Sequence, residues 1–217
     1  MKKILMTIAA AFVATAMSAQ MYVGGTIGYD KNTSKTTTLE TTQNDFTINP
    51  EFGFALDDKL GVGIELSYVS STTEEKWIGV GSDPVATRLK PNSTTFSLRP
   101  YARYQMFQVG KFNLFVDGGV DFAISKRKEV GIDAAGKVYD NKAGLDLGLF
   151  LQPGIAFNVN DKWSIVAKLR NMFTVDYSKG QVADVEGAPD PSSDLSFRLA
   201  SGGFTLGGLN FGVYYNF

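Results

Sequence analysis

The sequence has no cysteine and no histidine among its 217 residues. Without cysteine, no disulfide can stabilise the fold. Without histidine, the chain lacks the commonest general base and the commonest zinc ligand. GxSxG, P-loop and strand-following GxGxxG motifs are missing too, which argues against the usual hydrolase and nucleotide sites. We therefore expect no enzymatic activity, no cofactor and no metal site.

Strong net charge and long apolar runs are also missing. The net charge of −1 gives no field that would attract nucleic acid. Beyond the N-terminus, no segment reaches the roughly 18 consecutive apolar residues that a transmembrane helix requires. The chain is instead rich in aromatic residues and glycine, at 12% aromatic residues and 23 glycines, which favours an all-β fold.

The N-terminus has the pattern of a secretory signal peptide. Lys2 and Lys3 precede an apolar stretch, Ile4–Val13, and the small residues of "ATAMSAQ" follow. We predict a signal peptide over residues 1–19 with cleavage after Ala19, and one exported domain over residues 20–217. Met17 is larger than the residue usually found at its position, so a neighbouring bond is an alternative. A buried helix or a membrane anchor would be the other readings of this segment.

Eight runs of alternating apolar and polar residues follow, and a period of two predicts strands. The runs are Met21–Tyr29, Phe46–Leu56, Leu60–Tyr68, Thr94–Tyr104, Phe112–Ile124, Leu145–Val159, Trp163–Phe173 and Thr205–Phe217. One face of each run is apolar and the other carries polar and charged residues. A soluble sheet with one wet face would show the same alternation.

The connections between the runs separate these alternatives. Short links such as "DDK" and "NDK" alternate with four long ones, at Asp30–Asp45, Val69–Ser93, Ser125–Gly144 and roughly Thr174–Phe204. Outer-membrane barrels have short periplasmic turns, long external loops and an even number of strands. Aromatic residues of the apolar face also gather at the run ends, as in Tyr29, Tyr68, Tyr104 and Trp163, where two membrane interfaces would lie.

Three prolines lie on the apolar face of runs that lead to short links. They belong to an internal repeat: "PEFGFALDDKLGVGIEL" from Pro50 aligns with "PGIAFNVNDKWSIVAKL" from Pro153, and "PYARY" from Pro100 repeats its first half. Proline cannot donate to a ladder, and a closed barrel has no edge strand to hold it. We expect a bulge or kink at each proline.

These features together resemble the outer-membrane β-barrel domain family of Gram-negative bacteria, which includes small barrels shaped like the membrane domain of outer-membrane protein A. The resemblance rests on "SAQ", "LRPYARY", "PGIAFNVNDKWSIVAKL" and the terminal "LNFGVYYNF". It implies an all-β, eight-stranded antiparallel up-and-down transmembrane β-barrel in the cell outer membrane, in contact with outer-membrane lipids and lipopolysaccharide. Val213, Tyr215 and Phe217 look like the C-terminal signal that such chains present to the barrel-assembly machinery.

An eight-stranded barrel has an interior just wide enough for side chains. The predicted inward charges are Glu51, Glu65, Arg99, Arg103, Asp117, Asp121, Asp146, Lys168 and Arg170. Because an unpaired buried ion costs several kcal/mol, we expect these acids and bases to pair. Counting back from the short links places Arg99 opposite Asp117 and Glu51 opposite Glu65. Arg99 or Arg103 should then bridge the two glutamates.

The charged interior has three readings. It can plug the barrel, line a narrow path for ions or small solutes, or contain a catalytic carboxylate pair. Outside the barrel, Trp77, Ile78 and Val80 are candidates for contact with an extracellular partner, or pack under their own loop. Asp184, Glu186, Asp190 and Asp194 miss the EF-hand spacing, so we expect a solvated acidic loop there and no calcium site.

Three functions fit the sequence. The first is a barrel with a plugged interior and a structural or surface-contact role, which we favour. The second is a narrow, porin-like channel. The third is a soluble ligand-binding barrel with its apolar residues inside and its polar residues outside.

Reversing the charge in Arg99→Glu should lower the stability of the barrel, because the variant would place another carboxylate beside Glu65. Thermal melting of the purified protein and its conductance measure the effect. Unchanged values for both would contradict the paired network.

Overall fold

The computed structural model describes residues 20–37, 39–77, 92–128, 144–169, 173–179, 193–199 and 208–217. These ranges form ten β-strands, and none of their residues belong to a helix long and apolar enough to cross a membrane. Residues 1–19, predicted as the signal peptide, lie outside the described ranges. The strands are β1 (Met21–Lys35), β2 (Leu39–Ala55), β3 (Leu60–Trp77), β4 (Asn92–Val109), β5 (Phe112–Lys128), β6 (Gly144–Asn158), β7 (Trp163–Leu169), β8 (Phe173–Lys179), β9 (Ser193–Leu199) and β10 (Leu209–Asn216).

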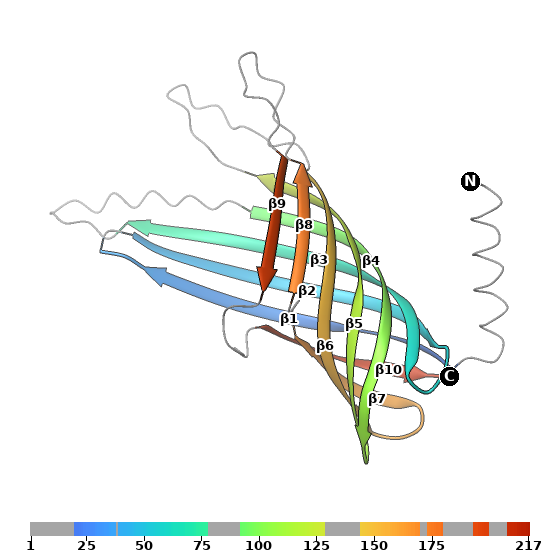
Figure 1. Ribbon diagram of the computed structural model, residues 1–217. Coiled ribbons are helices and arrows are strands. Elements are labelled where there is room, and N and C mark those ends of the chain that lie inside the picture. The colour runs from blue at the N-terminus through green and yellow to red at the C-terminus, as the bar shows by residue number, and fades with distance from the viewer. Residues whose placement is uncertain are drawn as a thin grey trace.

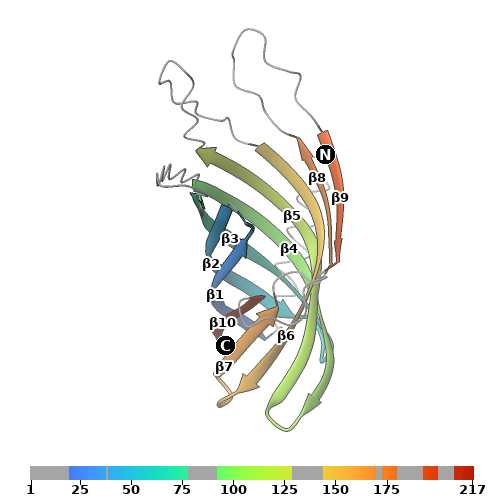
Figure 2. The ribbon, with the colours of Figure 1, turned by 90° about the vertical axis from the view of Figure 1, so that its left-hand side faces the viewer.

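The strands form one closed antiparallel sheet (Figures 1 and 2). Each strand from β1 to β6 pairs with the next along the chain, and β10 closes the ring by pairing with β1. β7 and β8 both pair with β6, while β10 pairs with β7 and β9 pairs with β8. The last four segments therefore fill two positions of the ring. The predicted eight-stranded up-and-down barrel is confirmed.

Several strands are longer than the alternating pattern predicted. Most of the expected first loop, Asp30–Asp45, is paired sheet, because β1 continues to Lys35 and β2 starts at Leu39. The expected loop Thr174–Phe204 contains most of β8 and all of β9. The prediction treated threonine-rich polar sequence as loop. Threonine is β-branched and favours strands, so the ends of β1 and β2 extend their ladder although neither face is apolar. β8 and β9 do have an apolar outward face, with Tyr177 and Phe197 46% and 69% exposed.

The register between β4 and β5 also differs from the prediction. β4 runs through "QMFQV", which the sequence pattern predicts as part of a turn, and the turn consists of Gly110, with φ of 59°, and Lys111. A bulge lies between Gln105 and Phe107. As a result Arg103, and not Arg99, stands opposite Asp117.

Strand pairing is interrupted beside each of the three prolines. At Pro50 and Pro100 the interruption contains no bulge. The β2–β3 ladder skips positions 49 and 50, and the β4–β5 ladder skips positions 99 and 100, with unchanged register on either side. The pairing of β6 passes from β7 to β8 beside Pro153, between Gly154 and Leu151. The expected bulge is therefore absent at Pro50 and Pro100, whereas the gap in one ladder agrees with a residue that has no N–H group to donate, and each proline pairs normally on its other side.

The internal repeat forms two matching turns. In the turn after β2, the Asp57 carboxylate accepts hydrogen bonds from the backbone N–H groups of Lys59 and Leu60, both at 2.7 Å. These two bonds lower the pKa of Asp57. Asn160 accepts the equivalent bonds from Lys162 and Trp163, both at 2.9 Å, in the turn after β6. We call the end of the barrel with these turns the turn end, and the opposite end the loop end.

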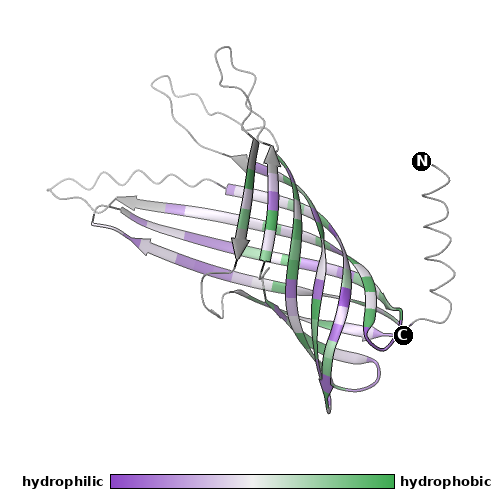
Figure 3. Cartoon of the chain, viewed as in Figure 1, coloured by the Kyte–Doolittle hydropathy of each residue, from purple (hydrophilic) through white to green (hydrophobic). Residues whose placement is uncertain are grey.

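The barrel is apolar outside and polar inside. Hydrophobic and hydrophilic residues alternate along its strands (Figure 3). Outward residues such as Ile27 and Leu149 are 56% and 55% exposed, whereas inward Thr26 and Asn49 are each 1% exposed. A soluble ligand-binding barrel would have the opposite arrangement, so that alternative is wrong for this fold. The aromatic residues predicted at the strand ends form ring contacts across strands, including Tyr68 with Phe96.

Inward glycines make room for aromatic rings on the neighbouring strands. A Cβ atom at Gly63 would lie 2.5 Å from the Tyr101 hydroxyl oxygen, and one at Gly154 would lie within 2.6 Å of two atoms of the Phe115 ring. The Tyr101 ring packs over Gly63 and the Phe115 ring packs over Gly154, on the inner wall of the barrel. This packing narrows the lumen around its centre.

Gly154→Ala should destabilise the barrel by roughly 1–3 kcal/mol, because the added methyl group displaces the buried Phe115 ring. Urea unfolding, followed by the gel-mobility shift that folded barrels show on boiling, measures the change. Gly118→Ala is the matched control. Its Cβ would face outward, 3.0 Å from the movable Leu151 side chain. Equal losses for the two variants would contradict this account.

Candidate functional site

A cluster of ionisable side chains crosses the middle of the lumen, and we call it the lumen cluster. Its members come from five strands: Glu51 of β2, Glu65 of β3, Arg99 and Arg103 of β4, Asp117 of β5 and Lys168 of β7. Each is at most 6% exposed. The strand alternation that turns apolar residues toward the outside turns these residues inward. They include six of the nine charges predicted for the lumen.

Lys168 joins the cluster across the barrel. Its ammonium group binds the carboxylates of Glu51, Glu65 and Asp117, the last two at 3.1 Å. Its exposed fraction is 0%. Three protons on the ammonium group meet three carboxylates, so its donors are matched to the available acceptors. The predicted pairing of Glu51 opposite Glu65 is present, but Lys168 is the cation that bridges them.

Arg103 forms the second centre of the cluster. Its Nε and Nη2 atoms donate to the two oxygens of Asp117 at 2.7 and 2.8 Å, and Nη2 also donates to Glu51 at 3.1 Å. Its guanidinium carbon lies 4.0 Å from the centre of the Phe115 ring. Bidentate pairing and ring stacking both suit the planar guanidinium group.

Arg99 extends the cluster toward the loop end. It pairs with Glu65, its register partner on β3, and its Nε atom lies 3.5 Å from an oxygen of Asp121. Its guanidinium carbon lies 3.8 Å from the centre of the Phe150 ring. Asp121 is less enclosed, with its side chain 23% exposed.

Three tyrosines that the sequence analysis did not assign to the site complete the cluster. Tyr101 donates to Glu51 at 3.0 Å, and its hydroxyl lies 2.7 Å from that of Tyr22. Tyr214 accepts a bond from Arg103 at 3.2 Å. All three lie at inward positions of their strands, so the same alternation that revealed the charges could have identified them.

The remaining predicted site residues lie apart from the cluster or are not described. Asp146 accepts a bond from Ser125 at 2.9 Å nearer the loop end. Arg170, Ile78 and Val80 lie outside the described residues, and Trp77 is described only as the last residue of β3, paired with Leu39. Val213 and Phe217 are 49% and 65% exposed on the outer face. The ring of Tyr215 contacts those of Trp163 and Phe217.

The lumen cluster is balanced in charge. Three buried carboxylates, Glu51, Glu65 and Asp117, meet three buried cations, and each ion has partners of opposite sign. Desolvating one ion costs several kcal/mol unless pairing offsets it, so balance is a condition for burying this many charges. Within the described ranges, no group of three or more acidic side chains could hold a metal ion.

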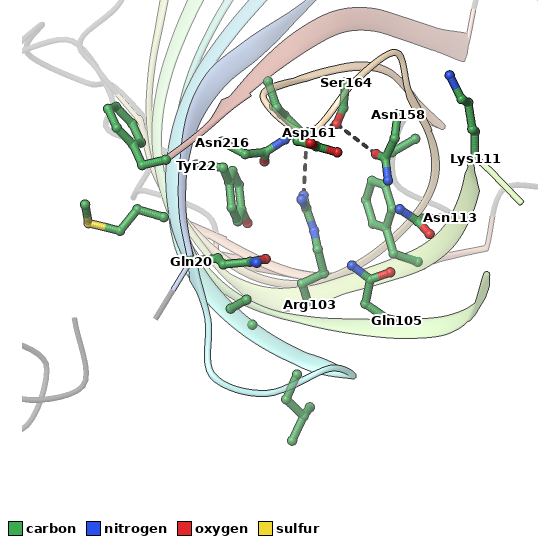
Figure 4. A pocket seen from close by; sticks show the side chains of 18 of the residues that line it. Gln20, Tyr22, Arg103, Gln105, Lys111, Asn113, Asn158, Asp161, Ser164 and Asn216 are labelled. Atoms are coloured by element: carbon green, nitrogen blue, oxygen red, sulfur yellow. Dashed lines mark hydrogen bonds between the residues drawn. The ribbon is translucent and has the colours of Figure 1, made fainter. Parts of the chain in front are cut away.

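Open space lies on the turn side of the cluster. A cavity of about 400 Å³ opens toward the turn end, with Arg103 reaching to its centre (Figure 4). Amide side chains line much of it, among them Gln105, Asn113, Asn158 and Asn216. On the loop side the inward residues include aspartates: Asp30, Asp45, Asp121, Asp146 and Asp176. The cluster therefore separates an amide-lined cavity from an acidic half of the lumen.

Comparison with known families agrees with this geometry. The model of the outer membrane protein beta-barrel domain matches residues 4–217. The chain belongs to this family. It is therefore an outer-membrane protein, and its apolar outer face is the surface that contacts lipid. No curated protein sequence matches the chain.

Solved structures of several outer-membrane proteins have a similar overall shape. Neisserial surface protein A is 12% identical, with 91% of this chain and 97% of that chain covered at a TM-score of 0.47. OprG from Pseudomonas aeruginosa is 12% identical, with 92% and 95% covered at 0.48. Ail from Yersinia pestis, in complex with the heparin analogue sucrose octasulfate, is 10% identical, with 92% and 97% covered at 0.40.

Lys168→Met should destabilise the barrel by roughly 3–5 kcal/mol, because three buried carboxylates lose a shared partner. Adding Glu51→Gln should restore part of the loss, since the double variant again balances the buried charges. Urea unfolding measures both. Lys162→Met, in the exposed turn after β6, is the control and should change stability by less than about 0.5 kcal/mol. A double variant less stable than Lys168→Met would contradict the role of charge balance.

Proposed function

We propose that this protein is a closed, non-conducting outer-membrane barrel that serves the structure of the envelope or contacts partners at the cell surface. The observation that carries the proposal is Lys168, which is fully buried and binds carboxylates from three strands on the facing wall. Those bonds cross the lumen at its centre. A solute would have to break several of them to pass, and each break would leave a buried charge unpaired.

The external role depends on the loop end. The strands β1, β2 and β3 extend beyond the apolar band there, so the barrel would present polar sheet above the lipid surface. Contact with an extracellular partner through these segments, including the region of Trp77, Ile78 and Val80, is part of the proposal. No catalytic step is proposed, because the acids of the lumen cluster are already bound to cations.

The outer face and the C-terminus suggest two further partners. The exposed apolar side chains fit membrane lipid, and in the outer leaflet they would meet lipopolysaccharide. The alternating Val213, Tyr215 and Phe217 lie at the end of the strand that closes the ring, where the barrel-assembly machinery would recognise them.

A narrow channel for cations or small solutes is the second candidate. It is favoured by the cavity of about 400 Å³ on one side of the cluster and the inward aspartates on the other. The lumen cluster, together with buried rings such as those of Phe115 and Tyr214, lies between the cavity and the aspartates. If the ions of the cluster exchanged partners, a continuous polar path could open.

Planar-bilayer recording of the purified full-length protein distinguishes the two candidates. We expect no stable open state for the wild type, because opening requires several buried ion pairs to separate together. The control is Lys162→Met, which changes a turn residue outside the lumen and should behave like the wild type. Reproducible, cation-selective openings of the wild-type protein would reject the closed barrel and support the channel.

A further inference from the structure

The apolar band around the barrel is uneven in height. On β1, β2 with the first turn residue, and β3, the outward apolar residues run over Met21–Tyr29, Phe46–Leu56 and Leu60–Tyr68. The next outward residues toward the loop end are Lys31, Asn44 and Ser70. On β5 and β6 the bands are longer, over Phe112–Ile124 and Leu145–Phe157. We call the outer surface of β1–β3 the short face and that of β5–β6 the tall face.

The difference is large on the scale of a membrane. A strand tilted by about 40° rises roughly 2.5 Å per residue, so the apolar bands of the short face are roughly 20 Å tall on β1 and β3 and roughly 25 Å on β2, against roughly 30 Å on the tall face. The apolar band of such barrels is usually about 25 Å tall. Tilting the barrel moves both edges of a face together and cannot lengthen the short face. Lipid beside the short face must therefore thin, which costs a fraction of a kcal/mol per Å.

An apolar groove lies where the short face meets β4 and β5. Its volume is about 670 Å³, and small residues form its base: Pro100 and Ala102 of β4 and Gly118 of β5. Val62, Ala102 and Gly118 are successive register partners across three strands. Small residues let two membrane proteins approach closely, because dispersion contacts replace a hydrophobic driving force there.

A ridge stands beside the groove. Phe52 and Phe54 of β2 form the wall of the groove on the side of the short face, with ring centres 4.7 Å apart in an edge-to-face arrangement. Phe52 is 41% exposed. Phe52 and Ile64 are register partners, and so are Ile64 and Pro100, so the ridge on β2, Ile64 on β3 and the small residues on β4 lie in one row along the groove.

We propose that a second copy of this chain docks on the short face, with the Phe52–Phe54 ridge of each copy in the groove of the other. A two-fold axis along the membrane normal near β3 would make both contacts at once, as an isologous interface requires. Both copies then share one orientation in the membrane. The contact also removes the two short faces from lipid, so thinning of the bilayer is relieved.

Cross-linking tests the location of the interface, since the chain has no cysteine and each introduced thiol is unique. Ala102→Cys places a thiol in the groove, and Leu149→Cys places one on the tall face. In native membranes, a thiol-specific cross-linker should yield several-fold more dimer with Ala102→Cys. Equal dimer yields from the two variants, or no dimer from Ala102→Cys, would overturn the proposal and indicate that lipid chains fill the groove.

Complementary variants test the ridge and the groove. Phe52→Ala removes the ridge residue, and Ala102→Trp fills the groove; each alone should reduce dimerisation several-fold, because both contacts of the pair are lost. A mixture of the two variants keeps one intact contact, between the Phe52 of one copy and the open groove of the other. Energy transfer between labelled copies in vesicles should therefore be higher in the mixture than in either variant alone. No recovery in the mixture would contradict the proposal.

Bilayer thickness supplies an independent test and a folding control. Dimerisation of the wild type should rise several-fold from short-chain to long-chain phosphatidylcholine vesicles, because the mismatch at the short face grows. Association that stays constant or falls would reject the mismatch argument. Every variant must retain the gel-mobility shift on boiling that marks a folded barrel, and Ile155→Trp on the tall face is the size-matched control for Ala102→Trp.

Discussion

Hydrocarbon offers no hydrogen-bond partner to a backbone N–H or C=O group, and the rest of this structure depends on that constraint. The ladder from β1 onward has to return to β1, which it does through β10. Closing eight positions makes the lumen narrow, and the alternation of side chains sends every second residue into it. Charges that enter so small a space must find opposite charges there. The lumen cluster around Lys168 and Arg103 meets this condition.

The cluster also helps to fix the register of the sheet. Glu65 with Arg99 and Arg103 with Asp117 are register partners on adjacent strands as well as ion pairs. If the register slipped by one residue, these charged side chains would face lipid and apolar side chains would face the lumen. Each misplaced charge would cost several kcal/mol. Lys168 adds a contact across the barrel that adjacent pairs cannot make. The buried ions thus penalise wrong pairings more strongly than they stabilise the correct one.

The faces of the strands could be predicted from the sequence because alternation has a period of two wherever one side meets lipid. Alternation gives no signal where that contrast disappears. In the threonine-rich ends of β1 and β2 both faces are polar, so the pattern predicts loop where the structure has strand. The bulge at Gln105–Phe107 and the two-residue turn shifted the β4–β5 register, since neither has an apolar signature. The contacts of Lys168 could not be predicted from the sequence for another reason. Which residues meet across a lumen depends on the stagger of all the strands of the barrel.

The strand β4 connects the interior and the exterior. Pro100 has no N–H group, and the β4–β5 ladder is interrupted at positions 99 and 100. On the inner side of this interruption Arg99 reaches Glu65, Asp121 and the Phe150 ring. On the outer side, the compact proline ring beside Ala102 and Gly118 leaves the groove in the apolar surface. Larger residues there would fill the groove without disturbing the ions, because alternate positions of one strand face separate environments. The paired charges of the interior and the relief of the outer surface can therefore change independently of one another.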